Sequence, residues 1–293
     1  MSPRSWLFVP GDSERKQAKA AEGAADALIL DLEDSVAPQR RAAARALVVA
    51  HLRARRGAAQ QLWVRVNGFQ SGLLLEDLAA VMPGAPHGIV LPKLSGVAQL
   101  AEAHHYLSAL ERREALPLHS TAVLGIATET ARAVLTMHEY AAPPPRLGGL
   151  TWGAEDLSVA LGARAVREAD GAFTFTFRLA RSSCLIAAAA LGIQAIDGVY
   201  ADFSDAAGLA RELAEARRDG FTGKLAIHPG QIEAINAAFT PTEAELAYAR
   251  RVVAAFAASP DVGVTSIDGR MIDRPHLLHA QRVLAAAEQL ARR

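Results

Sequence analysis

The sequence predicts an α/β fold: a (β/α)8 barrel of the TIM type, followed by a C-terminal helical extension. Eight short apolar runs, each of strand length, recur along the first 240 residues. Alanine-rich segments with apolar residues at helical spacing separate these runs, and two more helical stretches follow the last one. Regular alternation of strands and helices indicates a parallel sheet, and eight such units favour closure into a barrel over an open sheet.

The eight runs have the apolar character of buried strands. They occupy residues 5–9, 27–32, 62–66, 88–91, 122–127, 147–152, 195–200 and 224–227. Helices are expected between them, for example over 40–52, 97–110 and 205–218. No Gly-x-Gly-x-x-Gly pattern follows the first run, so a dinucleotide-binding, doubly wound sheet has no support.

Two segments fall outside the eightfold pattern. A long helix is expected over 173–191, after the sixth strand. Near the carboxyl terminus, helices over 242–258 and 274–291 flank a loop at 259–273. We therefore expect two domains, a catalytic barrel at 1–240 and a helical extension at 241–293.

Composition excludes several classes of partner. The 293 residues include 31 basic and 31 acidic side chains, so neither a nucleic-acid surface nor an anionic-membrane surface is expected. No apolar stretch is long enough to span a bilayer, and the first residues lack a signal-peptide pattern. The single cysteine, Cys184, fits core packing in a reducing compartment. These features predict a cytoplasmic protein.

Charged residues gather where the predicted strands end. Catalytic groups of a parallel barrel lie at this rim, and carboxylates on successive strands can converge on one Mg²⁺ ion. Glu129 and Asp156, after the fifth and sixth strands, are the candidates. Both also suit the start of a helix, where the macrodipole favours negative charge, and Glu155 competes with Asp156 for the metal.

Two basic residues at the same rim each have two alternative roles. Arg65 lies in an apolar strand and must face an anion, either a substrate oxygen or a neighbouring acid, Glu33 or Asp34. Lys93 could form a Schiff base with a carbonyl substrate, although the carboxylate pair favours metal chemistry.

Ten motifs occur in order along nearly the whole chain. They are RSWLFVPG (4–11), LDLEDSVA (30–37), VRVN (64–67), LPK (91–93), ETA (129–131), GAEDL (153–157), QAIDGVY (194–200), GFTGK (220–224), HPGQ (228–231) and GRMID (269–273). With them the chain resembles the citrate lyase beta-subunit-like proteins of the HpcH/HpaI aldolase/citrate lyase superfamily. That group includes malyl-CoA and citramalyl-CoA lyases.

The resemblance implies a role for each site residue. Glu129 and Asp156 would bind Mg²⁺, with Glu129 also next to the substrate, and Arg65 would contact the substrate. Asp273 would act as a catalytic acid or base from a C-terminal lid that reaches the site of a neighbouring subunit. The resemblance further implies a homotrimer, or a hexamer built from trimers, with a CoA thioester and a 2-oxo acid as ligands.

The implied reaction makes or breaks a carbon–carbon bond. A 3-hydroxyacyl-CoA such as malyl-, citramalyl- or citryl-CoA would give a 2-oxo acid and acetyl-CoA. A malate synthase-like condensation with thioester hydrolysis is one alternative. An acyl-carrier-dependent citrate lyase beta subunit is another, although the ETA motif favours the free-standing CoA-ester lyases.

Overall fold

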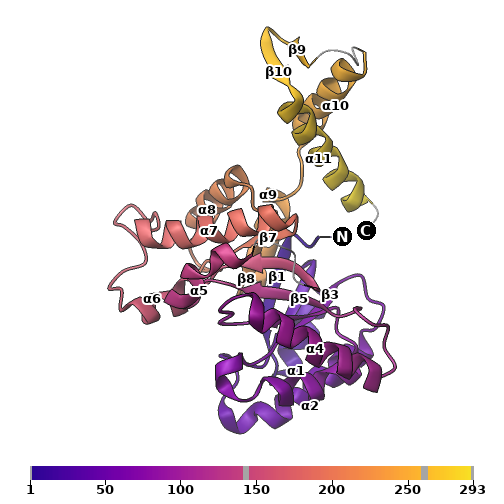
Figure 1. Cartoon of the computed structure of the whole chain (residues 1–293), viewed down its shortest axis with the longest axis vertical. Coiled ribbons are helices and arrows are strands. Elements are labelled where there is room, and N and C mark those ends of the chain that lie inside the picture. Colours follow the sequence, from indigo (N-terminus) through magenta and orange to yellow (C-terminus); the bar gives the residue numbers. More distant parts are fainter. Residues whose placement is uncertain (1, 141–144, 259–262, 292–293) are drawn as a thin grey trace. The chain divides into compact units, whose positions relative to one another are not determined.

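The computed structural model describes residues 2–140, 145–258 and 263–291. It contains a closed barrel of eight parallel strands, each paired with the next, with β1 paired to β8 (Figure 1). The strands are β1 Ser5–Pro10, β2 Ala27–Asp31, β3 Gln61–Arg65, β4 Gly88–Leu91, β5 Ala122–Ile126, β6 Leu147–Thr151, β7 Gln194–Asp197 and β8 Gly223–Ala226. The predicted (β/α)8 barrel and all eight of its strands are confirmed, with ends that differ from the predicted ones by at most three residues.

Helices follow the strands and surround the barrel. They are α1 Glu14–Ala21, α2 Arg41–Ala54, α3 Leu74–Val81, α4 Val97–Arg113, α5 Ala131–Leu135, α6 Ala154–Leu161, α7 Phe175–Leu191, α8 Ala206–Asp219 and α9 Ile232–Ala238. Short 3-10 turns connect several of them, including η1 Pro38–Arg40, η2 Phe69–Ser71 and η5 Pro229–Gln231. The long helix expected over 173–191 is α7, which ends where Gly192 adopts a left-handed conformation, φ 65°.

Large apolar side chains fill the barrel. Trp6 and Trp63 meet edge to face with ring centroids 5.0 Å apart, among buried aliphatic residues from other strands. Gly88 makes room for them, because a Cβ atom there would lie 2.1 Å from the Trp63 ring. The barrel interior is therefore packed, which leaves the strand ends as the place for a ligand.

A buried charge cluster ties the barrel wall to two outer helices. Lys224 of β8 is fully buried between Asp197 of β7, at 2.8 Å, and Glu212 of α8, at 2.6 Å. Asp197 also accepts hydrogen bonds from Trp152 and from Arg181 of α7. Each charge is thus paired, as burial requires.

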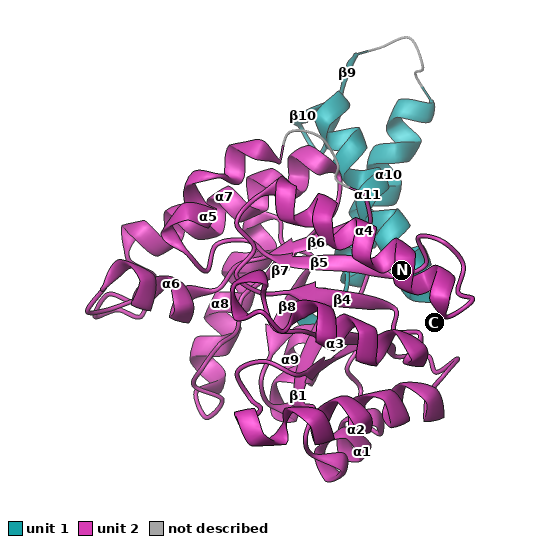
Figure 2. Ribbon diagram, turned by 60° about the horizontal axis from the view of Figure 1, so that its bottom comes forward, with its two compact units in different colours: residues 1, 237–293 teal, residues 2–236 magenta. Residues whose placement is uncertain are grey.

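The chain divides into two compact units, residues 2–236 and 237–293 (Figure 2). The second contains α10 Glu243–Ala257, α11 Arg274–Ala291 and an antiparallel pair of strands, β9 Val264–Ile267 and β10 Arg270–Asp273. The expectation of a plain loop at 259–273 is wrong for residues 264–273, and residues 259–262 lie outside the described chain. Asp268 and Gly269 adopt left-handed conformations in the tight turn that Asp-Gly favours between two strands.

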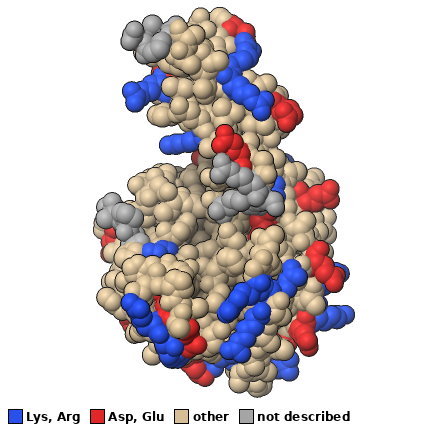
Figure 3. Space-filling view, turned by 90° about the vertical axis from the view of Figure 1, so that its right-hand side faces the viewer, with Lys and Arg blue, Asp and Glu red and all other residues tan. Residues whose placement is uncertain are grey.

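No helix among the described residues is long and apolar enough to cross a membrane. On the face shown in Figure 3, basic and acidic side chains are interspersed over each unit. That distribution matches the equal numbers of basic and acidic residues in the sequence.

Candidate active site

Five consecutive strands deliver charged residues to the carboxyl-terminal rim of the barrel. Asp31 ends β2, Arg65 ends β3, and Lys93, Glu129 and Asp156 follow β4, β5 and β6. Because parallel strands end at one rim, residues far apart in the sequence come together there. Asp156 stands in the first turn of α6, which begins after Gly153.

Arg65 is held by carboxylates from the neighbouring strand. Its Nε and Nη2 atoms lie 2.7 Å from the two carboxylate oxygens of Asp31, and its Nη1 lies 3.1 Å from Glu33 and 3.4 Å from Asp34. The Phe8 ring stacks beneath the guanidinium, 4.7 Å from its centroid. Burial alone would raise the pKa of Asp31, but the charge and hydrogen bonds of Arg65 lower it.

The sequence left open whether Arg65 contacts a substrate or pairs with Glu33 or Asp34. Those ion pairs are present, together with a two-pronged pair to Asp31 that the sequence reading did not include. Three of the five guanidinium N–H groups take part in hydrogen bonds, to Asp31 and Asp34. Nη1 also lies beside the Glu33 carboxylate, whereas the second N–H of Nη2 has no hydrogen bond within the described chain.

Lys93 connects the acidic residues of the rim. Its Nζ lies 2.7 Å from Glu33 and 3.4 Å from Asp156, and its backbone N–H donates to Glu129 at 2.5 Å. Burial lowers the pKa of the Lys93 amine, but the hydrogen bond and charge of Glu33 outweigh it and the pKa is raised. A Schiff base requires a neutral amine, so this environment disfavours the class I aldolase alternative.

Glu129 is almost completely buried, and no basic side chain forms an ion pair with it in the described part of the chain. Burial raises its pKa to about 8, and the nearby negative charges of Asp156 and Glu33 contribute in the same direction. Gly153 packs directly against it, since a Cβ at that position would lie 2.7 Å from Glu129 Cγ. A buried carboxylate beside another carboxylate is stabilised by a cation between them.

This donor set fits magnesium. Mg²⁺ is typically held by one or two carboxylates and keeps positions for water and substrate oxygens. Glu129 and Asp156 supply two carboxylates, and Asp156 faces the site beside Lys93, whereas Glu155 is exposed on the helix. Among the described residues no group of three or more His, Cys, Asp or Glu side chains is placed to hold a metal unaided.

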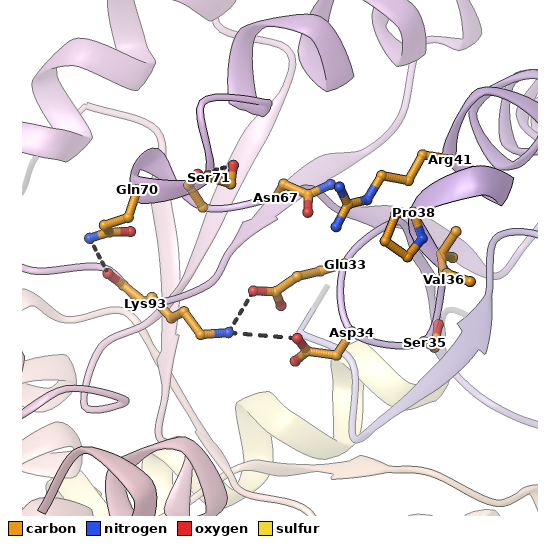
Figure 4. Close-up of a pocket in the computed structure, with 12 residues that line it drawn as sticks. Glu33, Asp34, Ser35, Val36, Pro38, Arg41, Asn67, Gln70, Ser71 and Lys93 are labelled. Atoms are coloured by element: carbon orange, nitrogen blue, oxygen red, sulfur yellow. Dashed lines mark hydrogen bonds and ion pairs between the residues drawn. The ribbon is translucent and has the colours of Figure 1, made fainter.

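A pocket of about 670 Å³ opens beside these charges, between the ends of β2, β3 and β4 (Figure 4). Lys93 and Gln70 lie at one end of it and Arg41 at the other, with Glu33 and Asn67 between them. The Nε atom of Arg41 is buried and has no hydrogen-bond partner within the described chain. The pocket therefore runs from the charged residues Glu33 and Lys93 to Arg41, whose guanidinium is suited to bind an anionic group of a ligand.

Comparison with known proteins shows the family. The family model described as HpcH/HpaI aldolase/citrate lyase matches residues 4–229. A citrate lyase subunit beta-like protein of Mycobacterium tuberculosis is 38% identical over 282 residues, covering 96% of this chain and 94% of that protein. The chain belongs to the HpcH/HpaI aldolase/citrate lyase family. The resemblance drawn from its ten motifs is confirmed.

Two further relatives bear on this member of the family. A (3S)-malyl-CoA thioesterase of Cereibacter sphaeroides is 38% identical over 290 residues, covering 98% of this chain and 95% of that protein. The crystal structure of the protein CitE from Mycobacterium tuberculosis in complex with magnesium, acetoacetate and coenzyme A has a TM-score of 0.79 at 36% identity. The match covers 97% of this chain and 98% of that one.

Asp273 forms an ion pair within its own unit. It is the last residue of β10, and its Oδ1 lies 2.5 Å from Nδ1 of His276, in the first turn of α11. His276 follows Asp273 by three residues at the start of a helix, and this contact could have been predicted from that spacing. Asp273 belongs to the C-terminal unit, whereas the other candidate residues belong to the barrel unit.

His228 and Cys184 have structural roles in the barrel unit. The His228 side chain accepts a hydrogen bond from the N–H of Gly230, in a capping box with Gln231, and its ring stacks on Phe203. Cys184 is completely buried, which raises the pKa of its thiol and disfavours the reactive thiolate.

Proposed function

We propose that this protein is a magnesium-dependent CoA-ester lyase. It would cleave, or form, the C–C bond of a 3-hydroxyacyl-CoA such as malyl-, citramalyl- or citryl-CoA, with a 2-oxo acid and acetyl-CoA as the products of cleavage. The observation that carries the proposal is the convergence of Glu129 and Asp156 around Lys93, beside the Arg65 guanidinium. The magnesium, acetoacetate and coenzyme A bound to the CitE relative support it.

Glu129 and Asp156 would hold the metal. When bound, Mg²⁺ supplies a Lewis acid for the carboxylate and carbonyl oxygens of the 2-oxo acid. The buried position of Glu129 excludes water from one side of the site, which strengthens its electrostatic interactions. The backbone N–H of Lys93 fixes the carboxylate of Glu129 in place.

Arg65 would stabilise charge that develops on the substrate. During cleavage a base takes the hydroxyl proton, the keto group of the 2-oxo acid forms as the C–C bond breaks, and the electron pair of that bond moves onto the thioester as an enolate. The N–H of Nη2 that is not committed to Asp31 is suited to an oxygen of this enolate. The two-pronged pair with Asp31 holds the guanidinium plane in one orientation, so little reorganisation is needed.

Asp273 would supply the proton that the enolate carbon gains. We propose that it does so from the C-terminal helical extension, 241–293, acting as a lid over the site of an adjacent subunit in a homotrimer or hexamer. Closure of such a lid would complete the site only when substrate is present. His276 holds the Asp273 carboxylate through the 2.5 Å contact. We further propose a cytoplasmic location, since Cys184 is a free thiol.

Thioester hydrolysis is the second candidate. The Cereibacter sphaeroides malyl-CoA thioesterase, 38% identical over 98% of this chain, favours it specifically. The same rim could bind malyl-CoA, with water attacking the thioester carbon in place of C–C cleavage. The malate synthase-like alternative ends in the same hydrolytic step.

One assay separates these activities. The purified protein is incubated with malyl-CoA, citramalyl-CoA and citryl-CoA, each with magnesium and with EDTA. We expect acetyl-CoA and the matching 2-oxo acid, in the magnesium samples alone. Free CoA with the intact hydroxy acid would establish hydrolysis instead. Turnover that is unaffected by EDTA would contradict the metal-dependent mechanism.

A further inference from the structure

Asn67 presents a fixed, unused hydrogen-bond acceptor in the wall of the pocket. The side chain is 3% exposed and follows β3, two residues after Arg65. Its Nδ2 donates to Oδ2 of Asp77 at 2.7 Å and to the carbonyl oxygen of Leu32 at 3.0 Å. Both partners are acceptors, so the amide nitrogen is identified by its contacts and uses both of its hydrogens. Within the described chain no hydrogen bond to Oδ1 of Asn67 occurs.

A buried ion pair holds this amide in its orientation. Asp77 of α3 is completely buried, and its Oδ1 lies 2.7 Å from Nε of Arg45 on α2. The other oxygen of Asp77 also accepts the backbone N–H of Asn67, at 2.8 Å. Rotation of the amide would bring Oδ1 against the Asp77 carboxylate, which is repulsive. The acceptor is therefore preorganised before any ligand binds.

The position of Asn67 in the pocket indicates which group of a bound ligand would contact this acceptor. Figure 4 shows Asn67 between Lys93 and Arg41, with its amide oxygen on the side of Glu33. A CoA thioester bound along the pocket, with its reacting carbons at Lys93 beside Glu129 and Asp156, would direct its phosphates toward Arg41. The pantetheine arm between the sulfur and the phosphates carries amide N–H donors. The cysteamine amide, which is the one near the sulfur, would pass closest to Lys93 and Glu33.

We infer that Asn67 is a specificity-determining residue: its Oδ1 accepts a hydrogen bond from the N–H of the cysteamine amide of the substrate thioester. The inference rests on the proposed function, because it requires a CoA-type thioester in this pocket. A site that hydrogen-bonds one donor discriminates against an analogue that lacks it, since the bound ligand then covers the acceptor and leaves it unpaired.

A pair of truncated substrates isolates this hydrogen bond. Malyl thioesters of N-acetylcysteamine and of 2-mercaptoethyl acetate differ only by an N–H in place of an ester oxygen. We expect wild-type kcat/KM to be higher for the amide by about tenfold or more, roughly the effect of one buried hydrogen bond. In Asn67→Ala the ratio should fall to about one. Asn67→Ser removes Oδ1 but keeps a hydroxyl donor for Asp77, and it should show the same loss of preference if the alanine variant fails to fold.

The outcomes separate three explanations. If Asn67 only supports the fold, the variants should lose activity on both thioesters equally, and the amide preference should persist; that result would overturn the inference. A wild-type ratio near one, with malyl-CoA still turned over, would also overturn it while leaving the proposed function intact. Failure of the wild type on all CoA thioesters would instead overturn the proposed function, and this inference with it.

Discussion

Arg65 and Asp31 form a two-pronged ion pair between neighbouring barrel strands, with Nε–Oδ1 and Nη2–Oδ2 distances of 2.7 Å each. The two residues are direct register partners in the β2–β3 pair. This pairing fixes the guanidinium at the rim. Burial lowers the pKa of Arg65, but the charge and hydrogen bonds of Asp31 outweigh it and raise the pKa, so the side chain remains charged. The planar guanidinium group of Arg65 is therefore a fixed part of the site and not a mobile charge on the surface.

The first prediction concerns the planar guanidinium group of Arg65. Arg65→Lys keeps a positive charge but loses the planar geometry that matches Asp31 and a substrate oxygen together. We expect at least about a tenfold loss of kcat/KM, equivalent to about 1.4 kcal/mol of transition-state stabilisation. Steady-state kinetics with the active CoA thioester would measure it, with Arg56→Lys at an exposed position as the control. A lower melting temperature with unchanged kinetics would show that Arg65 acts only as a structural ion pair.

The metal assignment gives the second prediction. Glu129→Gln and Asp156→Asn each remove one negative charge from the proposed Mg²⁺ site while keeping the side-chain shape. Both should abolish magnesium-dependent turnover and weaken Mg²⁺ binding, measured by titration calorimetry, without loss of the folded circular dichroism spectrum. Glu215→Gln, exposed on α8, is the matched control. Unchanged magnesium affinity in both site variants would refute the assignment.

Lys93 supports a third prediction. Because Glu33 and the other nearby carboxylates raise the pKa of Lys93, the amine should remain protonated and unreactive toward carbonyl groups. Borohydride added with pyruvate or oxaloacetate should therefore neither inactivate the protein nor add mass to it. A covalent adduct located on Lys93 by peptide mass spectrometry would revive the Schiff-base mechanism.

The proposed lid gives a fourth prediction, which concerns Asp273. Asp273→Ala and Glu129→Gln chains should each be inactive alone, because one lacks the proton donor and the other a metal ligand. If Asp273 serves a neighbouring subunit, mixed oligomers should recover part of the activity through sites that combine intact residues from two chains. The mixture is made by joint refolding and assayed beside each parent.

Two results would contradict that arrangement. Mixed oligomers without activity would indicate that Asp273 acts within its own chain or serves only to pair with His276. Full activity of the Asp273→Ala homo-oligomer would remove the residue from catalysis altogether. Sedimentation of each sample shows whether the assumed trimer or hexamer forms.

A fifth prediction concerns the buried charge cluster and pH. Burial alone would raise the pKa of Asp197, but Lys224 and Arg181 lower it to about 2, from 3.8. That difference corresponds to about 2 kcal/mol of stability. Since the folded pKa is depressed, the contribution is fully present above pH 3.8 and is lost as pH falls toward 2.

Asp197→Asn tests this contribution. The variant leaves Lys224 and Arg181 with one carboxylate fewer, so we expect about 3 kcal/mol of destabilisation at pH 7, measured by urea unfolding. The gap between variant and wild type should narrow as the pH is lowered from 5 to 2.5. A gap that is independent of pH would mean that the ionisation of Asp197 does not stabilise the fold.

The order and number of the barrel strands could be predicted from local sequence. Each strand is a short apolar run bounded by helical segments, and burial on both faces makes such runs recognisable without knowledge of their partners. The position of Glu129 and Asp156 at one rim follows from the same pattern, because every parallel strand ends on the same side. The β9–β10 hairpin was missed although its turn, Asp268-Gly269, has a recognisable sequence.

The partners of those rim residues were decided by tertiary structure. Asp31, Glu33 and Asp34 are close neighbours in the sequence, and only the strand register shows that Arg65 faces Asp31 in two-pronged geometry. The raised pKa of Glu129 likewise depends on burial and on charges from other strands. Apolar patterning is a property of a few adjacent residues, whereas electrostatic pairing depends on distances of a few ångströms between residues far apart in the chain, and barrel closure alone sets those distances.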